Sequence, residues 1–500
     1  MKKNLLSILF FSLIFIKISY SQIITTPAVE WSEPFNVESN GQFGLVTTPI
    51  IGPNVLFVAT KTINSFRGIE TISKFDANGR IKSQTIDAED RFSNYSTLTK
   101  YACQDGGILV YSSLKSWIRK YDANLNLSWQ QTISYTMINA TATLANGFYV
   151  YAQSTINNKN VIEVKKLKSD GNVEWSIDLT SFTSNITDIQ TTSDDGVIVG
   201  TNNGLRKYSA SGQLLWNNLS IVNATTFVPL DANTMYIQTK NSSLNSILNI
   251  VQLNTQNGSI IWTKSFSSEF IYGFAITKDK GCAIMTNTGL YKFNSGGVQE
   301  WKNTQYTSSP IVATGDGGIV IIQNNQLVKL TMGNVFNWNK TFDNGFSINI
   351  ANAPDNGIFV IAQRKTYTDT SKPLGFVFKI TSPDTPCKMD FDITGSDATF
   401  CTSGNLTLGY RIGNTNNNMN PPFYEFGFQW NKNNSPIPSA NTSTFVAQST
   451  GKYTLTFTQG TCESTSRTIE MKIISSPVIQ SDKSNICQGQ IMLYPNSWTK

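Results

Sequence analysis

The feature that most constrains the fold is a short apolar strand that recurs eight times along the chain. The copies read NVLFVAT from Asn54, GILVYSS from Gly107, GFYVYAQ from Gly147, GVIVGTN from Gly196, NTMYIQT from Asn233, GCAIMTN from Gly281, GIVIIQN from Gly318 and GIFVIAQ from Gly357. Most follow an Asp-Gly, Asn-Gly or similar pair, whose residues accept the positive φ angles of tight hairpin turns. Repeats must be identified first, because they decide the fold class of a chain in which they occur.

A second signature follows each copy: a strand that usually ends in Lys, a turn rich in Asp, Asn and Gly, and a strand that carries Trp. The Trp positions lie 37 to 46 residues apart, and Ser83 stands at this place in the first unit. Each unit therefore holds about four short strands, which predicts the blade of a β-propeller. We expect each Trp to pack between neighbouring blades rather than on a ligand, at Trp31, Trp129, Trp175, Trp216, Trp262, Trp301 and Trp338.

The last repeat lacks its Trp strand, whereas an isolated copy, VEWSEPF, stands near the N-terminus at residues 29 to 35. Pairing of this strand with the last unit would leave no open sheet edge in the ring. The sequence therefore predicts an eight-bladed propeller over residues 22–386, closed by its N-terminal strand.

These repeats resemble the secreted propellers of Bacteroidota-type bacteria, with repeats of the form T-DGG-yiv-G … K-D-nG-W. They also resemble the pyrroloquinoline-quinone-like propeller superfamily, with its inter-blade Trp. The resemblance rests on TTSDDGVIVGTNNGLRKYSASGQLLW and its siblings over about residues 24 to 386. It implies an all-β fold but no particular activity, because propellers include both enzymes and scaffolds. No adjacent cysteines occur, so the vicinal disulfide usual in quinone-dependent dehydrogenases is missing, and we expect no cofactor.

The segments outside the repeats indicate an exported, modular protein. Residues 1–21 have the basic start, apolar run and small-x-small end of a signal peptide, which predicts a secreted or cell-surface location without membrane insertion after cleavage. Residues 387–476 look like a bacterial immunoglobulin-like β-sandwich with a buried Trp430, and that resemblance implies a Cys401–Cys462 disulfide. Residues 477–500 start like a second such domain. In similar proteins, more modules and a signal for type IX secretion follow.

Composition lowers the expectation of catalysis. The chain has no His, which removes the usual base of nucleophilic catalysis and the commonest transition-metal ligand. Only 14% of residues are charged and no basic patch appears, so we expect no nucleic-acid partner. We expect no metal site. Cys103 and Cys282 stand in apolar strands, which predicts buried free thiols.

The second turn of each repeat varies in length, and insertions that gather on one face are where repeat proteins commonly bind. This face provides the candidate binding residues, although solvated hairpin tips remain the alternative: Arg67, Asn157, Asn158, Lys159, Asn241, Lys365 and Tyr367. The sequence favours a non-catalytic binding or adhesion protein that recognises an extracellular glycan or protein, with the immunoglobulin-like modules as a stalk. The alternatives are a carbohydrate-active hydrolase or lyase and a purely structural component of a surface assembly.

Overall fold

The computed structural model describes residues 29–35, 43–46, 50–51, 55–63, 68–88, 98–113, 115–183, 185–240, 247–267, 269–342, 345–353, 355–365, 375–380, 391–412, 427–459 and 462–474. Every regular element in these ranges is a β-strand. The predicted all-β class is therefore confirmed. The predicted signal peptide and second C-terminal domain lie outside the described residues.

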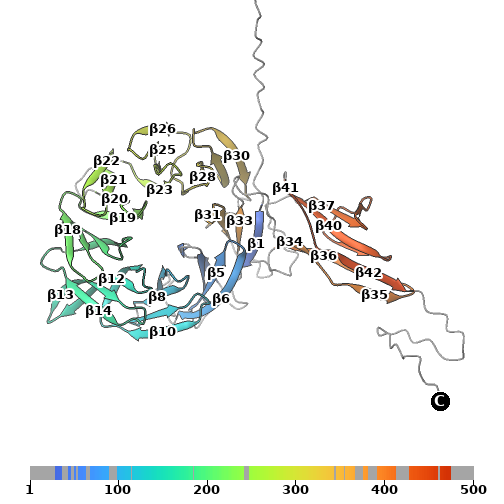
Figure 1. Cartoon of the computed structure of the whole chain (residues 1–500), viewed down its shortest axis with the longest axis horizontal. Helices are drawn as coiled ribbons and strands as arrows, with labels where there is room; N and C mark the ends of the chain where they lie inside the picture. Colours follow the sequence, from blue (N-terminus) through green and yellow to red (C-terminus); the bar gives the residue numbers. More distant parts are fainter. Residues whose placement is uncertain are drawn as a thin grey trace, which may run out of the picture.

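In this part of the chain, eight antiparallel sheets follow one another around a ring (Figure 1). We number them sheets 1 to 8. The strands of the first four sheets are β2 (Phe43–Val46), β3 (Ile50–Ile51), β4 (Leu56–Ile63), β5 (Gly68–Asp76) and β6 (Gly79–Ala88) in sheet 1; β7 (Leu98–Ala102), β8 (Ile108–Ser112), β9 (Trp117–Tyr121) and β10 (Leu127–Thr132) in sheet 2; β11 (Thr136–Ala142), β12 (Phe148–Ile156), β13 (Lys159–Leu167) and β14 (Val173–Asp178) in sheet 3; and β15 (Ile186–Thr191), β16 (Val197–Thr201), β17 (Gly204–Tyr208) and β18 (Leu214–Asn218) in sheet 4.

The remaining four sheets of the ring repeat the same order of strands. They contain β19 (Ala224–Pro229), β20 (Thr234–Lys240), β21 (Ile247–Asn254) and β22 (Ile260–Ser267) in sheet 5; β23 (Ile271–Ile276), β24 (Cys282–Thr286), β25 (Leu290–Phe293) and β26 (Gln299–Asn303) in sheet 6; β27 (Ile311–Ala313), β28 (Ile319–Gln323), β29 (Gln326–Leu330) and β30 (Phe336–Thr341) in sheet 7; and β31 (Phe346–Asn352), β32 (Ile358–Arg364), β33 (Gly375–Ile380) and β1 (Val29–Phe35) in sheet 8.

The N-terminal strand β1 pairs antiparallel with β33, next to which β32 and β31 complete the sheet. The predicted pairing of this strand with the last repeat is therefore confirmed. β1 also contacts β6 of sheet 1, so the two ends of the repeat region meet.

The second strand of each sheet is the apolar repeat strand, and these strands form the core. Almost every described side chain in them is buried. All five residues of β8, β16 and β24 are buried, since both faces of these strands lie against neighbouring sheets. The fourth strands alternate between exposed and partly buried side chains. Propeller sheets stacked face to face give this difference between inner and outer strands.

The C-terminal unit packs a small sheet of β34 (Phe391–Thr394), β36 (Leu406–Ile412) and β39 (Phe445–Ala447) near a larger one. The larger sheet contains β35 (Ala398–Cys401), β42 (Ile469–Ile474), β40 (Gly451–Gln459), β37 (Gly427–Lys432) and β38 (Ser435–Pro436), with β41 (Cys462–Thr465) also on β40. Trp430 is fully buried in this unit. β36 contacts β1, which joins the unit to sheet 8 (Figure 1).

Strand register contradicts the predicted Cys401–Cys462 disulfide. Cys401 lies beside Ile474 at one end of the larger sheet, whereas Cys462 lies beside Gln459 at the far end of β40. Gly451 of β40 pairs with Met471, so eight residues of strand, about 26 Å at about 3.3 Å per residue, separate the two ends. A disulfide needs Cα atoms within about 7 Å. The order Cys-Trp-Cys resembled an immunoglobulin domain but did not define which strand ends meet.

Candidate functional site

A buried lysine lies one or two residues before the end of the third strand in seven of the eight sheets in the described residues. In sheet 5, Gln252 takes the same place. The seven lysines are at most 7% exposed: Lys74, Lys120, Lys166, Lys207, Lys292, Lys329 and Lys379. The sequence analysis noted this Lys as part of the repeat but assigned it no role. Burial of an ammonium group is costly unless it is paired and hydrogen-bonded, so the partners of these lysines show what the position does.

Aspartates of the first turns are the most frequent partners. Lys207 Nζ lies 2.7 Å from Asp194, and Lys292 Nζ lies 2.7 Å from Asp279. The other pairs of this kind are Lys120–Asp105, Lys329–Asp316 and Lys379–Asp355. Burial alone would raise the pKa of Asp194, but hydrogen bonds from Lys207 and Thr192 outweigh it and hold that pKa below its ordinary value.

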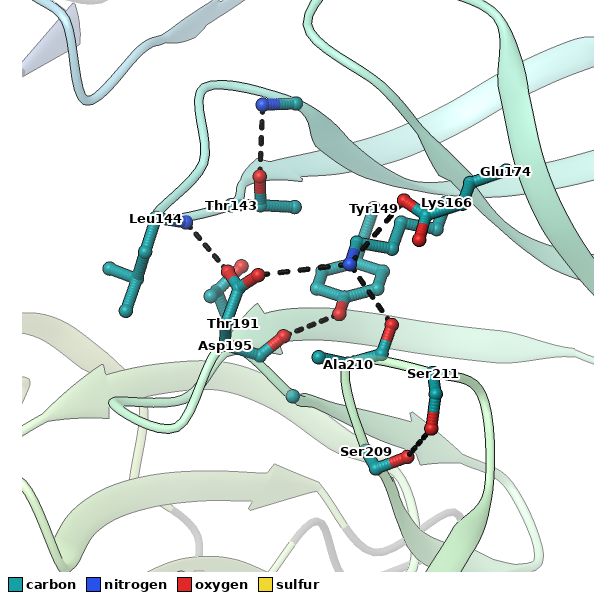
Figure 2. Close-up of polar contacts among 12 residues, drawn as sticks. Thr143, Leu144, Tyr149, Lys166, Glu174, Thr191, Asp195, Ser209, Ala210 and Ser211 are labelled. Atoms are coloured by element: carbon teal, nitrogen blue, oxygen red, sulfur yellow. Dashed lines mark hydrogen bonds and ion pairs between the residues drawn. The ribbon is translucent and has the colours of Figure 1, made fainter.

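In sheet 3 the buried lysine, Lys166, is also paired with acidic groups, but they come from other positions, as Figure 2 shows. The first turn of sheet 3 has no Asp, and Lys166 Nζ instead lies 3.5 Å from Glu174 and 3.7 Å from Asp195 of sheet 4. Lys166 also donates to the carbonyl oxygen of Ala210 at 2.9 Å. Tyr149 adds a hydrogen bond to the backbone oxygen of Asp195. The lysine of one sheet is thus bound by groups of the next.

The repeated tryptophans donate to the same turn of the following sheet. Trp175 Nε1 donates to Ala210 O at 3.0 Å, the carbonyl that also binds Lys166. Equivalent bonds join Trp129 to Ser169, Trp216 to Thr255, Trp262 to Ser295 and Trp301 to Met332. Trp338 is buried in the cluster that contains Val360 and Phe378 of sheet 8. These six tryptophans therefore lie at contacts between sheets.

The junction of sheets 8 and 1 uses the same groups across the two ends of the repeats. Lys379 Nζ donates to Glu30 at 2.7 Å and to Ala77 O at 3.1 Å. Trp31 Nε1 also donates to Ala77 O, at 2.9 Å, and its ring stacks on Phe75 with centroids 5.9 Å apart. Glu30 and Trp31 thus bind the C-terminal repeat to the first one.

The structure corrects the predicted placement of Ser83 at the Trp position of the first sheet. Its third turn is one residue shorter, so the register places Lys82, not Ser83, opposite Lys74. Lys74 Nζ donates to the carbonyl oxygens of Gly106 and Ala123 of sheet 2, both at 2.6 Å. Burial lowers the pKa of Lys74, although Asp105 opposes the shift.

These ionic groups are structural, because the same set recurs at successive junctions and is buried there. The two thiols of the repeats are equally inert: Cys103 and Cys282 are buried as predicted, and burial raises the pKa of each to about 12. In the described residues, no three His, Cys, Asp or Glu side chains are grouped to hold a metal ion. The described part of the chain also contains no helix that is long and apolar enough to cross a membrane.

A polar cavity of about 300 Å³ lies where sheets 2 and 3 meet. It opens on the face that carries the second turns and the connections between sheets, which is the face predicted to bind. We call it the Tyr135 cavity. Its lining residues come from the second turn of sheet 2, the β10–β11 connection and the β12–β13 hairpin: Ser116, Ile133, Ser134, Tyr135, Thr136, Gln153, Ser154, Thr155 and Asn160.

Backbone hydrogen bonds hold the walls of the cavity. Ile133 N donates to Ser116 O at 2.8 Å, which joins the connection to the turn of sheet 2. Thr136 pairs with Gln153 across β11 and β12, and Thr155 pairs with Asn160 across the hairpin. Burial raises the pKa of Tyr135 to about 12, so its hydroxyl stays protonated at neutral pH and can donate a hydrogen bond.

The structure brings only some of the predicted binding residues together. Asn157, Asn158 and Lys159 form the exposed tip of the β12–β13 hairpin, between the cavity residues Thr155 and Asn160. Both asparagines have positive φ, 49° and 60°, which identifies them as turn residues. Lys365 is exposed just after β32 in sheet 8, and β31 and β33 of that sheet lie across the ring from β12 and β13 (Figure 1). The other three candidates lie outside the described residues: Arg67, Asn241 and Tyr367.

The cavity residues themselves were missed. They lie in a short connection, TISYT, and in strand ends that carry no unusual residue types. The variable length of the second turn indicated the correct hairpin, but the wall formed by the neighbouring sheet had no signal in the sequence.

Comparisons with known proteins support the scaffold. Residues 114–342, just under half of the chain, match the family model described as outer membrane protein assembly factor BamB. No curated protein matches the chain.

Similar solved structures include a streptogramin B lyase, with 13% identity, a TM-score of 0.35, and coverage of 71% of this chain and 100% of the lyase. The quinohemoprotein alcohol dehydrogenase of Comamonas testosteroni shows 8% identity and a TM-score of 0.44, with coverage of 73% and 78%. Sqt1 of Chaetomium thermophilum, bound to the N-terminus of ribosomal protein L10, shows 9% identity and a TM-score of 0.44, with coverage of 71% and 100%. With the match to the BamB family model and the repeated four-stranded sheets, the chain has an all-β, propeller-like fold.

Proposed function

We propose that this chain is a secreted or cell-surface binding protein without catalytic activity, whose propeller recognises an extracellular glycan or protein. The observation that carries the proposal is the Tyr135 cavity on the face of the long hairpins. Small-molecule sites are concave, with a few polar groups that fix the orientation of the ligand.

The charges of the propeller support binding over hydrolysis. Glycoside hydrolysis commonly needs two carboxyl groups that flank the scissile bond. The lining of the Tyr135 cavity contains no carboxylate, and Asp194 and Asp279 of the first turns are bound to buried lysines of their own sheets. A hydrolase or lyase therefore remains the weaker alternative for this cavity.

The proposal includes a finer architecture. The eight sheets would be eight blades of a closed propeller, and the two C-terminal sheets an immunoglobulin-like sandwich that acts as a stalk. The parallel pairing of β35 with β42 and the buried Trp430 support the sandwich. Export would follow cleavage before Gln22, and N-terminal sequencing of protein from the culture medium tests this point.

Binding of the purified full chain to a glycan array and to whole cells tests the function. We expect retention on a subset of glycans or on protease-sensitive cell-surface sites, with no released product. Release of cleaved saccharide would instead support the hydrolase or lyase. Absence of both binding and turnover would overturn the proposal in favour of a structural component.

A further inference from the structure

We propose that the Tyr135 cavity binds one neutral sugar ring at the end of a glycan. This inference rests on the proposed binding function and names the ligand class of the site. The cavity is the described feature of the propeller that combines a concave shape with polar groups whose hydrogen-bonding capacity is unused.

Two polar side chains of the wall lack partners. The hydroxyl of Ser154 is closed off from solvent and has no hydrogen-bond partner in the described part of the chain. The Gln153 side chain, which lines the same wall, also makes no hydrogen bond to the described residues. The Gln153 side chain is only partly buried, so its amide can bond to a ligand in the cavity, whereas the enclosed Ser154 hydroxyl is not counted as a ligand contact.

The chemistry of the lining selects a hydroxyl-rich ligand. Ser and Thr hydroxyls and Asn and Gln amides each donate and accept hydrogen bonds, as sugar hydroxyls do. Thr155 Oγ1 already donates to Asn160 Oδ1 at 3.3 Å, which leaves the Asn160 amide protons for a ligand acceptor. Tyr135 adds an aromatic ring against which the C–H groups of a sugar ring can pack.

The nearby charges cancel, which argues for a neutral sugar. Lys165 Nζ lies 5.4 Å from the centroid of the Tyr135 ring, but it is also 2.9 Å from Glu163. Glu163 further accepts a hydrogen bond from Ser176 at 2.6 Å. A carboxylate sugar entering the cavity would find no unpaired cation among the lining residues, so desolvation of its charge would be uncompensated.

The size of the cavity limits the ligand to one ring. A volume of about 300 Å³ equals about ten water molecules at about 30 Å³ each, and it stands at the lower end of small-molecule sites. A longer glycan would therefore place its terminal residue in the cavity and extend along the exposed hairpin tip at Asn157 and Asn158.

Titration of the full chain with methyl glycosides of glucose, galactose, mannose and N-acetylglucosamine tests the inference, with glucuronate and N-acetylneuraminate as anionic probes. We expect at least one neutral glycoside to bind with Kd of about 1 mM or below, and at least tenfold more tightly than either anionic probe. Tyr135→Ala and Gln153→Leu should each weaken binding at least tenfold, whereas Tyr135→Phe should retain most of it. Tyr272→Ala, which removes a half-exposed tyrosine of sheet 6, is the matched control and should bind as the wild type does.

Hydrogen exchange of the wild-type chain provides a readout that does not depend on folding of the variants. The bound glycoside should slow exchange in peptides that contain residues 133–136 and 153–160. Glycan binding on the array without these effects would overturn the cavity assignment and leave the proposed function standing. Equal or tighter binding of the anionic probes would overturn the neutral-sugar assignment. Failure of the array and of every glycoside, with whole-cell binding retained, would overturn the cavity assignment alone, and failure of whole-cell binding as well would overturn both.

Discussion

Lys207 and Trp216 lie opposite each other on β17 and β18, and both donate to the carbonyl oxygen of Thr255 in the next sheet, each at 3.1 Å. A β-bulge follows Lys207 in this pairing, and the same irregularity occurs beside Lys166 and Lys292. A bulge re-aims a side chain locally. At this junction and at two others, a Lys and a Trp bind one carbonyl oxygen of the next sheet: Ala210 O binds Lys166 and Trp175, and Ala77 O binds Lys379 and Trp31.

Loss of the buried ammonium group should destabilise this junction. Lys207→Met removes the bonds of the fully buried ammonium group to Asp194 and to Thr255 O, and Asp194 is partly exposed and stays solvated, so we expect a loss of about 2 kcal/mol in the free energy of unfolding. Urea unfolding checks this value. A double-mutant cycle with Asp194→Asn should show a coupling of about 1 kcal/mol or more. Additive effects of the two single changes would contradict the ion pair as a stabilising unit.

Closure of the ring should depend on Trp31. Its side chain is 1% exposed, stacks on Phe75 and donates to Ala77 O, so Trp31→Ala should cost about 3–5 kcal/mol. Thermal melting of the full chain measures the effect. Trp129, which is half-buried, provides the comparison, and its change to Ala should cost less. A melting temperature unchanged by Trp31→Ala would refute the closure contact.

The glycines of the third turns should be sensitive wherever a Trp ring lies on them. Gly258 has φ of +73°, and a Cβ there would lie 2.6 Å from the Trp216 ring. We expect Gly258→Ala to destabilise the chain by about 1–3 kcal/mol, because it combines backbone strain with a displaced ring. Gly333 has no heavy atom within 4 Å of an added Cβ, so Gly333→Ala should change the unfolding midpoint little. Equal effects at both sites would contradict the packing argument.

Asp188 should make part of the stability depend on pH. Burial raises the pKa of Asp188 to about 6, although hydrogen bonds from Ile189, Phe227 and Asn139 oppose the shift. The folded chain therefore binds this proton more tightly than the unfolded chain, whose aspartates have a pKa of about 3.9. Between pH 4 and 6 the contribution of Asp188 to stability falls as pH rises, and it is constant above about pH 7.

The expected size of this effect is about 1 kcal/mol between pH 5 and 7. Unfolding titrations of the wild type and of Asp188→Asn isolate it, because the difference between the two proteins should become more favourable to the wild type as pH falls from 7 to 5. A difference that is flat over this range would show that the Asp188 pKa is not raised.

Local sequence patterns predicted the repeated strands because hairpin turns and alternating apolar residues are written in consecutive residues. The pairing of VEWSEPF with the last repeat followed from counting strands, and β1 does pair with β33. Counting failed at Ser83, because a turn shorter by one residue shifts Lys82 into its place. The Cys401–Cys462 disulfide implied by the immunoglobulin-like resemblance also failed, because the order of residues carries no information on which strand ends meet.

The sequence by itself determined the all-β class, the length of the repeat and the face that carries the variable turns. These depend on periodicity and turn chemistry, which act over a few residues. Only the tertiary structure decided that the repeated Lys is buried with Asp and with a carbonyl of the next sheet, and that Tyr135 and Gln153 share a cavity. Such contacts join side chains of different strands and different sheets, so their distances depend on how strands and sheets pack.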